Sequence, residues 1–414
     1  MTTSKKYRLI VFRKLTLWLL NILFVLVFVL SLQYLKIEIF YKEKNIPFTG
    51  DSFYNPYKSY SANTLKANFH THSTAWYHLT NGSQKPQDIF NYYKVHGYDI
   101  ISLSNYQKIT RNKKDTAYIP VYEHGYNLRK SHQLVINSDR VTFFDFSLFS
   151  DFNTKQQVIK KLKQSGGLIA LAHPKLRGGY RADEMEYLRG YDFIEVFNSF
   201  VTSEGIWDAA LTSGYPAWIL ADDDCHNIYH PELIFNSWNR IGAKGRTRDN
   251  IINALKQGCS YGVMNMNHKE VNFLDSCTVK NGTIRVKFSN NADVITFVAD
   301  RGAVKKEFYN RSSASYKINK EDSYVRVEAR NGTQLIYLNP VIRYNGNQLS
   351  FNNGFPTVNA GLTIVARILA LILSLAILII ILLVNGIIAF PIHPGRFVTD
   401  IRKKHGVSLG LNRN

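Results

Sequence analysis

The stretch LKANFHTHS, residues 65–73, ends a short apolar run with two histidines that stand two residues apart, His70 and His72. Side chains at positions i and i+2 of a strand point to the same side, so the two imidazoles are able to bind one metal ion. A single HxH in a chain with 12 histidines is weak evidence by itself. The rest of the sequence therefore has to decide whether this strand opens a metal site.

The segment 64–265 alternates short apolar runs with stretches of helical periodicity. One predicted helix begins near Pro86, which suits a first helical turn, and ends at Gly97, which suits a C-terminal cap. A second predicted helix, amphipathic, covers about 154–165 and ends at a Gly-Gly pair. Repeated alternation of this kind predicts a parallel α/β sheet or barrel.

Side chains able to bind metal stand at the ends of several of these apolar runs. In parallel α/β folds the carboxyl ends of the strands form the functional face, which would bring such side chains together. Histidine and carboxylate ligands suit zinc, manganese or iron. The repeated placement favours a metal site over a purely structural interpretation. The candidates are His70, His72, His132, His173, Glu195, Asp222, Asp223, Asp224 and His226.

Residues 270–350 differ in character from the segment before them. Short β-rich runs with alternating apolar residues, such as Ile284, Val286 and Phe288, are separated by turns. The pattern predicts a small antiparallel β-sandwich. It carries no catalytic constellation, so we expect an accessory domain that packs against the first or shapes its substrate site.

The composition sets limits on the class of protein. Of the 414 residues, 45% are hydrophobic and 13% aromatic, which excludes a disordered or collagen-like chain. The three cysteines form no metal-binding spacing and no even disulfide framework. The net charge is +20, and the positive excess that remains outside the two basic ends of the chain could attract anionic lipid, phosphorylated glycan or nucleic acid, or it could belong to a solvated surface.

Two segments, 15–36 and 364–390, are too apolar for a soluble protein, and each is long enough to cross a bilayer as a helix. A buried core helix is the alternative for each segment, and a cleaved signal peptide is a further alternative for the first. Its apolar part exceeds a usual signal-peptide core and no small-residue cleavage site follows, which favours a retained anchor.

The charges that flank these segments predict their orientation. The flank 1–14 and the tail 391–414 are both basic, and the positive-inside rule places such flanks in the cytoplasm. We therefore expect an integral membrane protein with both termini cytoplasmic and the middle of the chain extracytoplasmic, where nucleic acid is not an expected partner. The basic residues are Lys5, Lys6, Arg8, Arg13 and Lys14 in the flank, and Arg396, Arg402, Lys403, Lys404 and Arg413 in the tail, against one acid, Asp400.

The order of the motifs over 64–265 resembles the PHP superfamily, named for polymerase and histidinol phosphatase. The HxH strand is followed by Glu123 in IPVYE, His132 in KSHQLVI, His173 in LAHP, and Asp224 with His226 in DDDCH. This resemblance implies a distorted (β/α)7 barrel that holds two or three metal ions. The β-rich tail and its YLNPVIRY ending also resemble the branch that contains carbaryl-hydrolase-like metallohydrolases.

The resemblance further implies a ligand set for each metal. It assigns the first metal to His70, His72, Glu123 and Asp224, and the second to Glu123, His132 and His173. A third metal would use His78 and His226, together with a histidine from a TDH motif. Here ISLSNY places Asn105 and Tyr106 at that motif, which puts the third site in doubt.

We therefore expect an α/β chain with a (β/α)7 PHP-type barrel, a small β-sandwich and two flanking transmembrane helices. Its predicted activity is hydrolysis of a phosphate mono- or diester by a metal-bridged hydroxide, with a lipid or a glycan as a candidate carrier of the ester. The candidate catalytic residues are His78, Tyr106 and His226. The candidate substrate-binding residues are Lys175, Arg177 and Arg181, whose alternative is a solvated basic loop.

Two other functions stay open at this point. One is hydrolysis of an amide, carbamate or carboxylic ester on the same metal core, which the branch resemblance allows. The other is a degenerate, non-catalytic binding domain, which the altered ISLSNY motif suggests.

Overall fold

The computed structural model describes residues 3–112, 115, 117–346 and 354–387. The chain divides into two compact units, Met1–Lys36 with Val365–Asn414, and Ile37–Ile364. The predicted cytoplasmic tail 391–414 and the last residues of the predicted span 364–390 lie outside the described residues.

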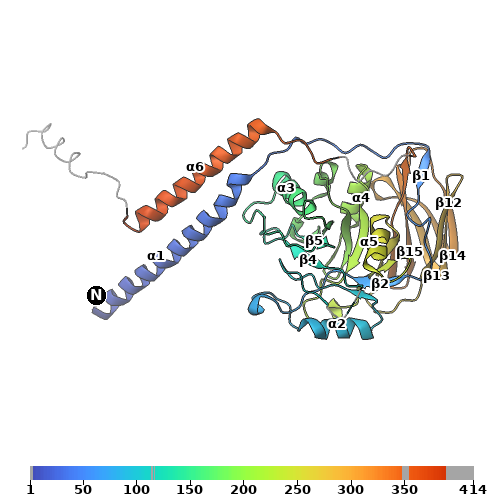
Figure 1. The fold of residues 1–414 in the computed structure, drawn as a ribbon, viewed down its shortest axis with the longest axis horizontal. Coiled ribbons are helices and arrows are strands. Elements are labelled where there is room, and N and C mark those ends of the chain that lie inside the picture. Colours follow the sequence, from blue (N-terminus) through green and yellow to red (C-terminus); the bar gives the residue numbers. More distant parts are fainter. Residues whose placement is uncertain (1–2, 113–114, 116, 347–353, 388–414) are drawn as a thin grey trace, which may run out of the picture. The chain divides into compact units, whose positions relative to one another are not determined.

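The first unit is built from two apolar helices, α1 (Thr3–Ser31), which continues into the 3-10 turn η1 (Leu32–Lys36), and α6 (Ala360–Val384). The segments Val11–Lys36 and Ala360–Val384 are long and apolar enough to cross a membrane. The two helices lie side by side (Figure 1), joined by a 2.8 Å hydrogen bond between the Ser31 and Ser374 hydroxyls. Asn21 and Asn385 exchange a reciprocal pair of 2.9 Å amide hydrogen bonds. Polar pairs of this kind hold helices together where the surroundings are apolar.

The second unit contains all the strands and the remaining helices. Its strands are β1 (Ser52–Tyr54), β2 (Leu65–Asn68), β3 (Ile100–Ile101), β4 (Val121–His124), β5 (Gln133–Ile136), β6 (Leu168–Leu171), β7 (Phe193–Asn198), β8 (Val201–Thr202), β9 (Trp218–Asp222), β10 (Ser237–Ile241), β11 (Ser260–Met264), β12 (Leu274–Lys280), β13 (Thr283–Ala299), β14 (Ala303–Lys317), β15 (Tyr324–Asn331), β16 (Gln334–Leu338) and β17 (Val341–Tyr344). Its helices are α2 (Pro86–Val95), α3 (Phe152–Lys163), α4 (Glu204–Thr212) and α5 (Arg248–Lys256), with 3-10 turns η2 (Trp76–His78), η3 (Leu176–Gly178), η4 (Ala182–Glu186), η5 (Pro231–Leu233) and η6 (Asp300–Gly302).

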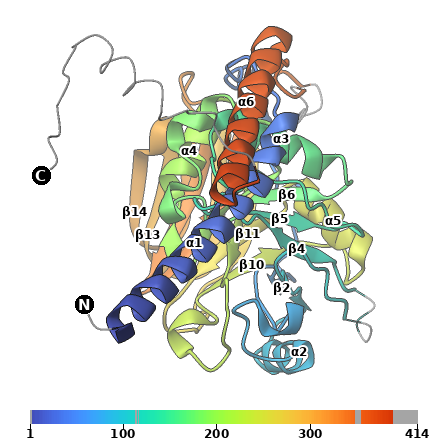
Figure 2. The ribbon, with the colours of Figure 1, turned by 90° about the vertical axis from the view of Figure 1, so that its left-hand side faces the viewer.

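Seven of these strands form a closed circuit of backbone pairing. β2 pairs with β3, and the pairing β4–β5–β6–β7–β9 forms the other side. Isolated bridges join the two parts, one between Tyr106 and Glu123 and one between Thr71 and Cys225. Figure 2 shows β4, β5 and β6 as neighbours in this part of the unit. The α/β class is confirmed, and the ends of several strands meet where the bridges close the circuit.

The prediction that the strands of this segment run parallel is wrong for β5. β2–β3, β6–β7 and β7–β9 are parallel, but β5 runs antiparallel to both β4 and β6. No helix lies between β4 and β5, and a short connection can only join antiparallel strands. As a result, the start of β5 lies at the same edge as the ends of β4 and β6, which explains why His132 precedes its strand.

The β-rich segment shows the predicted alternation, with Ile284, Val286 and Phe288 buried on one face of β13. It does not form a separate sandwich sheet, because β16 pairs with β11 and so joins β12–β17 to an 11-stranded sheet that reaches β10, β2 and β3. The physical reason is that β11 pairs with β10 along one edge, and its other edge forms antiparallel backbone hydrogen bonds with β16. Figure 1 shows α3 and strands β12–β14 on opposite sides of this unit. The boundary between 64–265 and 270–350 as separate domains stays a prediction.

Candidate metal centre

The side chains with metal-binding atoms come from several strand ends of the circuit. His70 and His72 follow β2, Glu123 lies on β4, and His132 directly precedes β5. His173 follows β6 and Asp224 follows β9. All six are at most 4% exposed. Residues that are distant in the sequence therefore converge in one buried cluster, because their strand ends share one edge.

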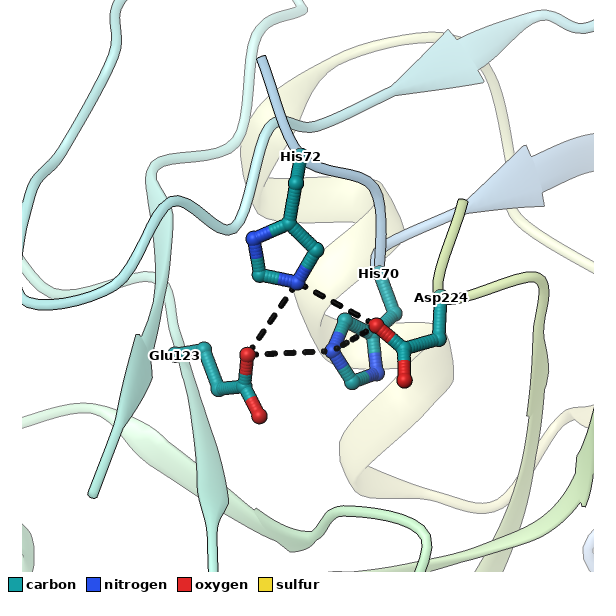
Figure 3. A group of neighbouring side chains, drawn as sticks. All are labelled: His70, His72, Glu123 and Asp224. Atoms are coloured by element: carbon teal, nitrogen blue, oxygen red, sulfur yellow. Dashed lines mark ion pairs between the residues drawn. The ribbon is translucent and has the colours of Figure 1, made fainter. Parts of the chain in front are cut away.

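The first group consists of His70, His72, Glu123 and Asp224. In Figure 3 the ring nitrogens of both histidines face the two carboxylates. The Nε2 atom of His70 lies 3.4 Å from Glu123 Oε2 and 3.1 Å from Asp224 Oδ1. The Nε2 atom of His72 lies 3.1 Å and 3.2 Å from the same two oxygens. Four donor atoms thus surround one point.

The second group consists of Glu123, His132 and His173. The other oxygen of Glu123, Oε1, lies 2.5 Å from His132 Nδ1 and 3.1 Å from His173 Nε2. Glu123 therefore presents one oxygen to each group. This position would allow Glu123 to serve a metal ion in either group.

The donor atoms of the first group fit a metal ion better than they fit one another. His70 Nε2, His72 Nε2, Glu123 Oε2 and Asp224 Oδ1 are all buried and have no hydrogen-bond partner among the described residues. Ligand atoms about 2.0–2.2 Å from a tetrahedral zinc ion lie roughly 3.3–3.6 Å from each other, close to the separations found here. Buried polar atoms are rarely left unsatisfied, so these four atoms indicate a metal site.

The charges at the site also call for a cation. Burial opposes protonation of His70, but the carboxylates of Asp224, Glu195 and Glu123 outweigh it and raise the His70 pKa well above its ordinary value. Burial likewise works against ionised Glu123, yet His132 and His70 hold the pKa of Glu123 well below its usual range. The charged form of each carboxylate is thus stabilised by positive charge on the facing histidines. A divalent cation would supply that charge with neutral imidazoles as ligands.

Glu195 on β7 orients two of the histidines from behind. Its Oε1 accepts a 2.9 Å hydrogen bond from His70 Nδ1, which leaves Nε2 of that ring free to bind metal. Its Oε2 accepts a 2.5 Å hydrogen bond from the backbone N–H of His173. One buried carboxylate therefore positions a ligand of each group.

Three consecutive aspartates, Asp222 to Asp224, stand at the end of β9, and of these three Asp224 belongs to the cluster. Asp222 accepts hydrogen bonds from the backbone N–H of Phe69 and from Asn239, at 2.7 and 2.9 Å. Asp223 accepts hydrogen bonds from Asn68 and Tyr93, at 3.0 and 2.8 Å, and burial raises its pKa to about 6. Both therefore fix the scaffold around the ligand strands, although sequence spacing alone made them equal candidates.

Two ligands have strained backbone conformations. Asp224 has φ +53° and His173 has φ +29°, values that cost roughly 1–3 kcal/mol for residues other than glycine. In Asp224 this turn follows shortly after β9 and places the carboxylate beside His70 and His72. Strain of this kind typically persists where function requires a particular side-chain direction.

Tyr106 and His226 lie beside the first group and are less buried than its members. The His226 ring stacks on His72 with centroids 4.3 Å apart, and its Nε2 lies 3.3 Å from Asp224 Oδ1. The Tyr106 ring stacks on His72 at 4.7 Å. Burial, with Glu123 and Asp224, raises the Tyr106 pKa above its usual value. A molecule that approaches from solvent would meet these two side chains first.

The other predicted site residues, His78, Lys175, Arg177 and Arg181, are exposed, and none belongs to either metal group. His78 lies in η2, and Arg181 pairs with Asp183 at 2.8 Å. Asn105 is buried and holds the backbone, because its side chain accepts a 2.8 Å hydrogen bond from the N–H of Ser73.

A cation that the sequence did not single out lies near the cluster. The ammonium of Lys130 is 5.8 Å from the Tyr106 ring centroid, and its charge acts on His132, whose pKa burial lowers. No carboxylate lies within ion-pair distance of Lys130 in the described part of the chain. In the sequence, the feature of Lys130 that points to the site is its position two residues before His132.

No protein-family model and no curated protein matches the chain. Among solved structures, the chain is similar to a two-domain protein from Bacteroides vulgatus ATCC 8482 that contains a predicted PHP-like metal-dependent phosphoesterase. The identity is 12%, the TM-score is 0.39, and the similarity covers 77% of this chain and 99% of that one. At this level of similarity, the assignment of a function has to rest on the side chains of the site.

Proposed function

We propose that this chain is a membrane-anchored hydrolase that depends on two divalent metal ions and cleaves a phosphate mono- or diester. The observation that carries this proposal is the position of Glu123, whose two oxygens belong to two different groups of metal-binding atoms. The seven-strand circuit and the order of the motifs are consistent with a (β/α)7 PHP-type barrel. Zinc, manganese and iron all suit the donor set.

His70, His72, Glu123 and Asp224 would hold one ion, and Glu123, His132 and His173 the other. When bound, a pair of ions bridged by one carboxylate activates water and stabilises the charge that develops on phosphate oxygens. Glu195 keeps Nδ1 of His70 protonated, so that its Nε2 stays an acceptor that faces the cluster.

We assign the leaving-group side to His226 and Tyr106, because these side chains lie between the buried cluster and solvent. The Nδ1 atom of His226 is buried and has no hydrogen-bond partner among the described residues. The Tyr106 hydroxyl is able to donate a hydrogen bond as a neutral phenol, consistent with its raised pKa. A third metal bound through His226 remains a separate proposal, and exposed His78 gives it no support.

For substrate binding we propose Lys130 in place of Arg181. Arg181 already pairs with Asp183, whereas Lys130 stands beside Tyr106 without a carboxylate partner among the described residues. Lys175 and Arg177 stay candidates from the sequence. A phosphorylated lipid or glycan is the substrate class that fits an anchored enzyme.

Activity and metal content of the purified full-length protein would test this function. We expect close to two ions per chain, with hydrolysis of bis-p-nitrophenyl phosphate or p-nitrophenyl phosphate that His70→Ala abolishes. Rapid cleavage of aryl esters without cleavage of phosphate esters would support the amide, carbamate or carboxylic ester alternative, on the carbaryl-hydrolase-like model. Less than one ion per chain with no hydrolysis would support a non-catalytic binding domain.

Membrane anchoring rests on the two apolar helices and their basic flanks. We propose that both termini are cytoplasmic and that Ile37–Ile364 is extracytoplasmic. Alkaline phosphatase fused after residue 346 should be active, whereas the same reporter fused at either terminus should be inactive. The reverse pattern would exclude this orientation and would make a nucleic acid substrate worth testing.

A further inference from the structure

A cavity of about 410 Å³ opens beside α2 and the loop after His226, and none of the residues that line it belongs to either metal group. This volume lies within the range of small-molecule sites. The cavity is lined by Lys66, Tyr92, His96, Ile228, Tyr229, Pro231, Ile234, Phe235 and His268.

The walls of this cavity are flat and aromatic. Tyr92 stacks on Phe235 with ring centroids 5.7 Å apart and an angle of 15° between the planes. Tyr229 meets Tyr92 edge-on at 6.4 Å, and the His96 ring lies 4.4 Å from Phe235. Phe235 and His268 have φ values of +61° and +58°, an unfavourable conformation that often marks ligand sites. A planar ring is the shape that such walls accommodate.

Lys66 contributes an ammonium to a lining that also contains the imidazoles of His96 and His268. Lys66 is only 9% exposed, and its Nζ lies 4.2 Å from the Tyr98 ring and 4.4 Å from the Trp238 ring. No carboxylate is within ion-pair distance of this ammonium among the described residues. Glu270 is the carboxylate with the largest electrostatic effect on the Lys66 pKa. It already accepts hydrogen bonds of 3.0 and 3.1 Å from Arg240.

The charge of Lys66 is therefore stabilised by the two ring faces and by Glu270, Asp223 and Asp99, none of which forms an ion pair with the ammonium. Burial lowers its pKa to about 8, so the ammonium is still largely protonated at neutral pH. The Tyr98 hydroxyl and Trp238 Nε1 also lack hydrogen-bond partners in the described part of the chain. A buried cation without an ion-pair partner is costly, and a bound anion would remove that cost. The same charge disfavours the quaternary ammonium ligands that aromatic pockets otherwise bind.

We propose that this cavity is a second ligand site, which binds a small planar organic anion with its ring against Tyr92 and Phe235 and its charged group on Lys66. This site does not depend on the hydrolase function, because it shares no residue with the metal groups. The aromatic walls and the Lys66 ammonium together favour an aromatic or cyclic carboxylate or phosphate as the ligand.

The test uses 4-fluorobenzoate as the probe and its neutral analogue 4-fluorobenzamide, observed by ¹⁹F NMR with the full-length protein in detergent. We expect saturable binding of the anion and at least about tenfold weaker binding of the amide, since a hydrogen bond to a charged group contributes at that level. Lys66→Met should weaken binding of the anion by a similar factor, and Lys66→Arg should retain it. Tyr229→Ala removes a wall residue that is 71% exposed, so it should weaken binding without a risk to folding.

His70→Ala separates this site from the metal centre, where a carboxylate is also able to bind. Retained binding in His70→Ala, with loss in Lys66→Met and Tyr229→Ala, would support the proposal. Equal binding of acid and amide would overturn it, as would binding that Lys66→Met leaves intact. Loss of binding in His70→Ala alone would place the probe at the metal centre and would also overturn the proposal.

Discussion

Glu195 Oε1 and His70 Nδ1 form a 2.9 Å hydrogen bond between two side chains that are fully buried. The bond fixes the ring of His70 so that Nε2 points at Glu123 and Asp224. The other oxygen of Glu195 accepts a hydrogen bond from the backbone N–H of His173, which belongs to the second group. A single carboxylate behind the cluster therefore couples the positions of one residue from each candidate metal group.

The first prediction follows from this relationship. Glu195→Gln keeps the size of the side chain but removes its charge, so we expect the affinity for the metal ions to fall about 10–100-fold. Competition with a chelator would measure the change. The matched control is Glu186→Gln, because Glu186 is half-exposed, pairs with Lys44 and belongs to neither metal group. An unchanged affinity in Glu195→Gln would show that this carboxylate does not position the ligands.

The second prediction concerns the bridging position of Glu123. Glu123→Gln should lose both ions, because each group uses one oxygen of this carboxylate. His132→Ala should lose one ion only, since His132 belongs to the second group alone. Metal content per folded chain, with the melting temperature as a check of folding, would measure both. Two ions retained in Glu123→Gln would contradict a bridge.

Much of the site was predictable because strand periodicity and strand ends leave a clear mark on the sequence. The predicted helix from Pro86 to Gly97 is confirmed as α2 (Pro86–Val95), and Gly97 has the positive φ of a cap. His70 and His72 follow a strand at the spacing of side chains that share a face. These features are local, so a short stretch of residues determines them.

The rest depends on contacts between distant segments. The direction of β5 is set by its pairing with β4 and β6, which local periodicity does not encode. The choice of Asp224 over Asp222 and Asp223 depends on a backbone turn and on partners such as Asn239 and Tyr93. The cavity around Lys66 needs α2, β2 and the loop after His226 to meet, so no single stretch reveals it.

The third prediction separates two candidate substrate-binding cations. Lys130→Ala should raise KM for p-nitrophenyl phosphate roughly tenfold with a smaller effect on kcat, because the ammonium would contact the substrate in the ground state as well as the transition state. Arg181→Ala should leave both constants near those of the unchanged protein, since Arg181 is already paired with Asp183. The opposite result would restore the loop after His173 as the phosphate-binding element.

The last prediction concerns how the β-rich segment is fixed to the strand circuit. Asp208 on α4 accepts 2.8 Å hydrogen bonds from Nε and Nη2 of Arg326 on β15, and both side chains are buried. Asp208→Ala removes two hydrogen bonds of the buried guanidinium and leaves its pairing with Glu328, so we expect the free energy of unfolding to fall by about 3 kcal/mol, the lower end of the range for a broken buried pair. Denaturant unfolding of the full-length protein would measure it. The double variant Asp208→Ala with Arg326→Met should recover part of the loss, because it removes the guanidinium that Asp208 balances, although Glu328 then loses its own partner. If the double variant were as unstable as the sum of the two single variants, the pair would contribute through packing and not through its charges.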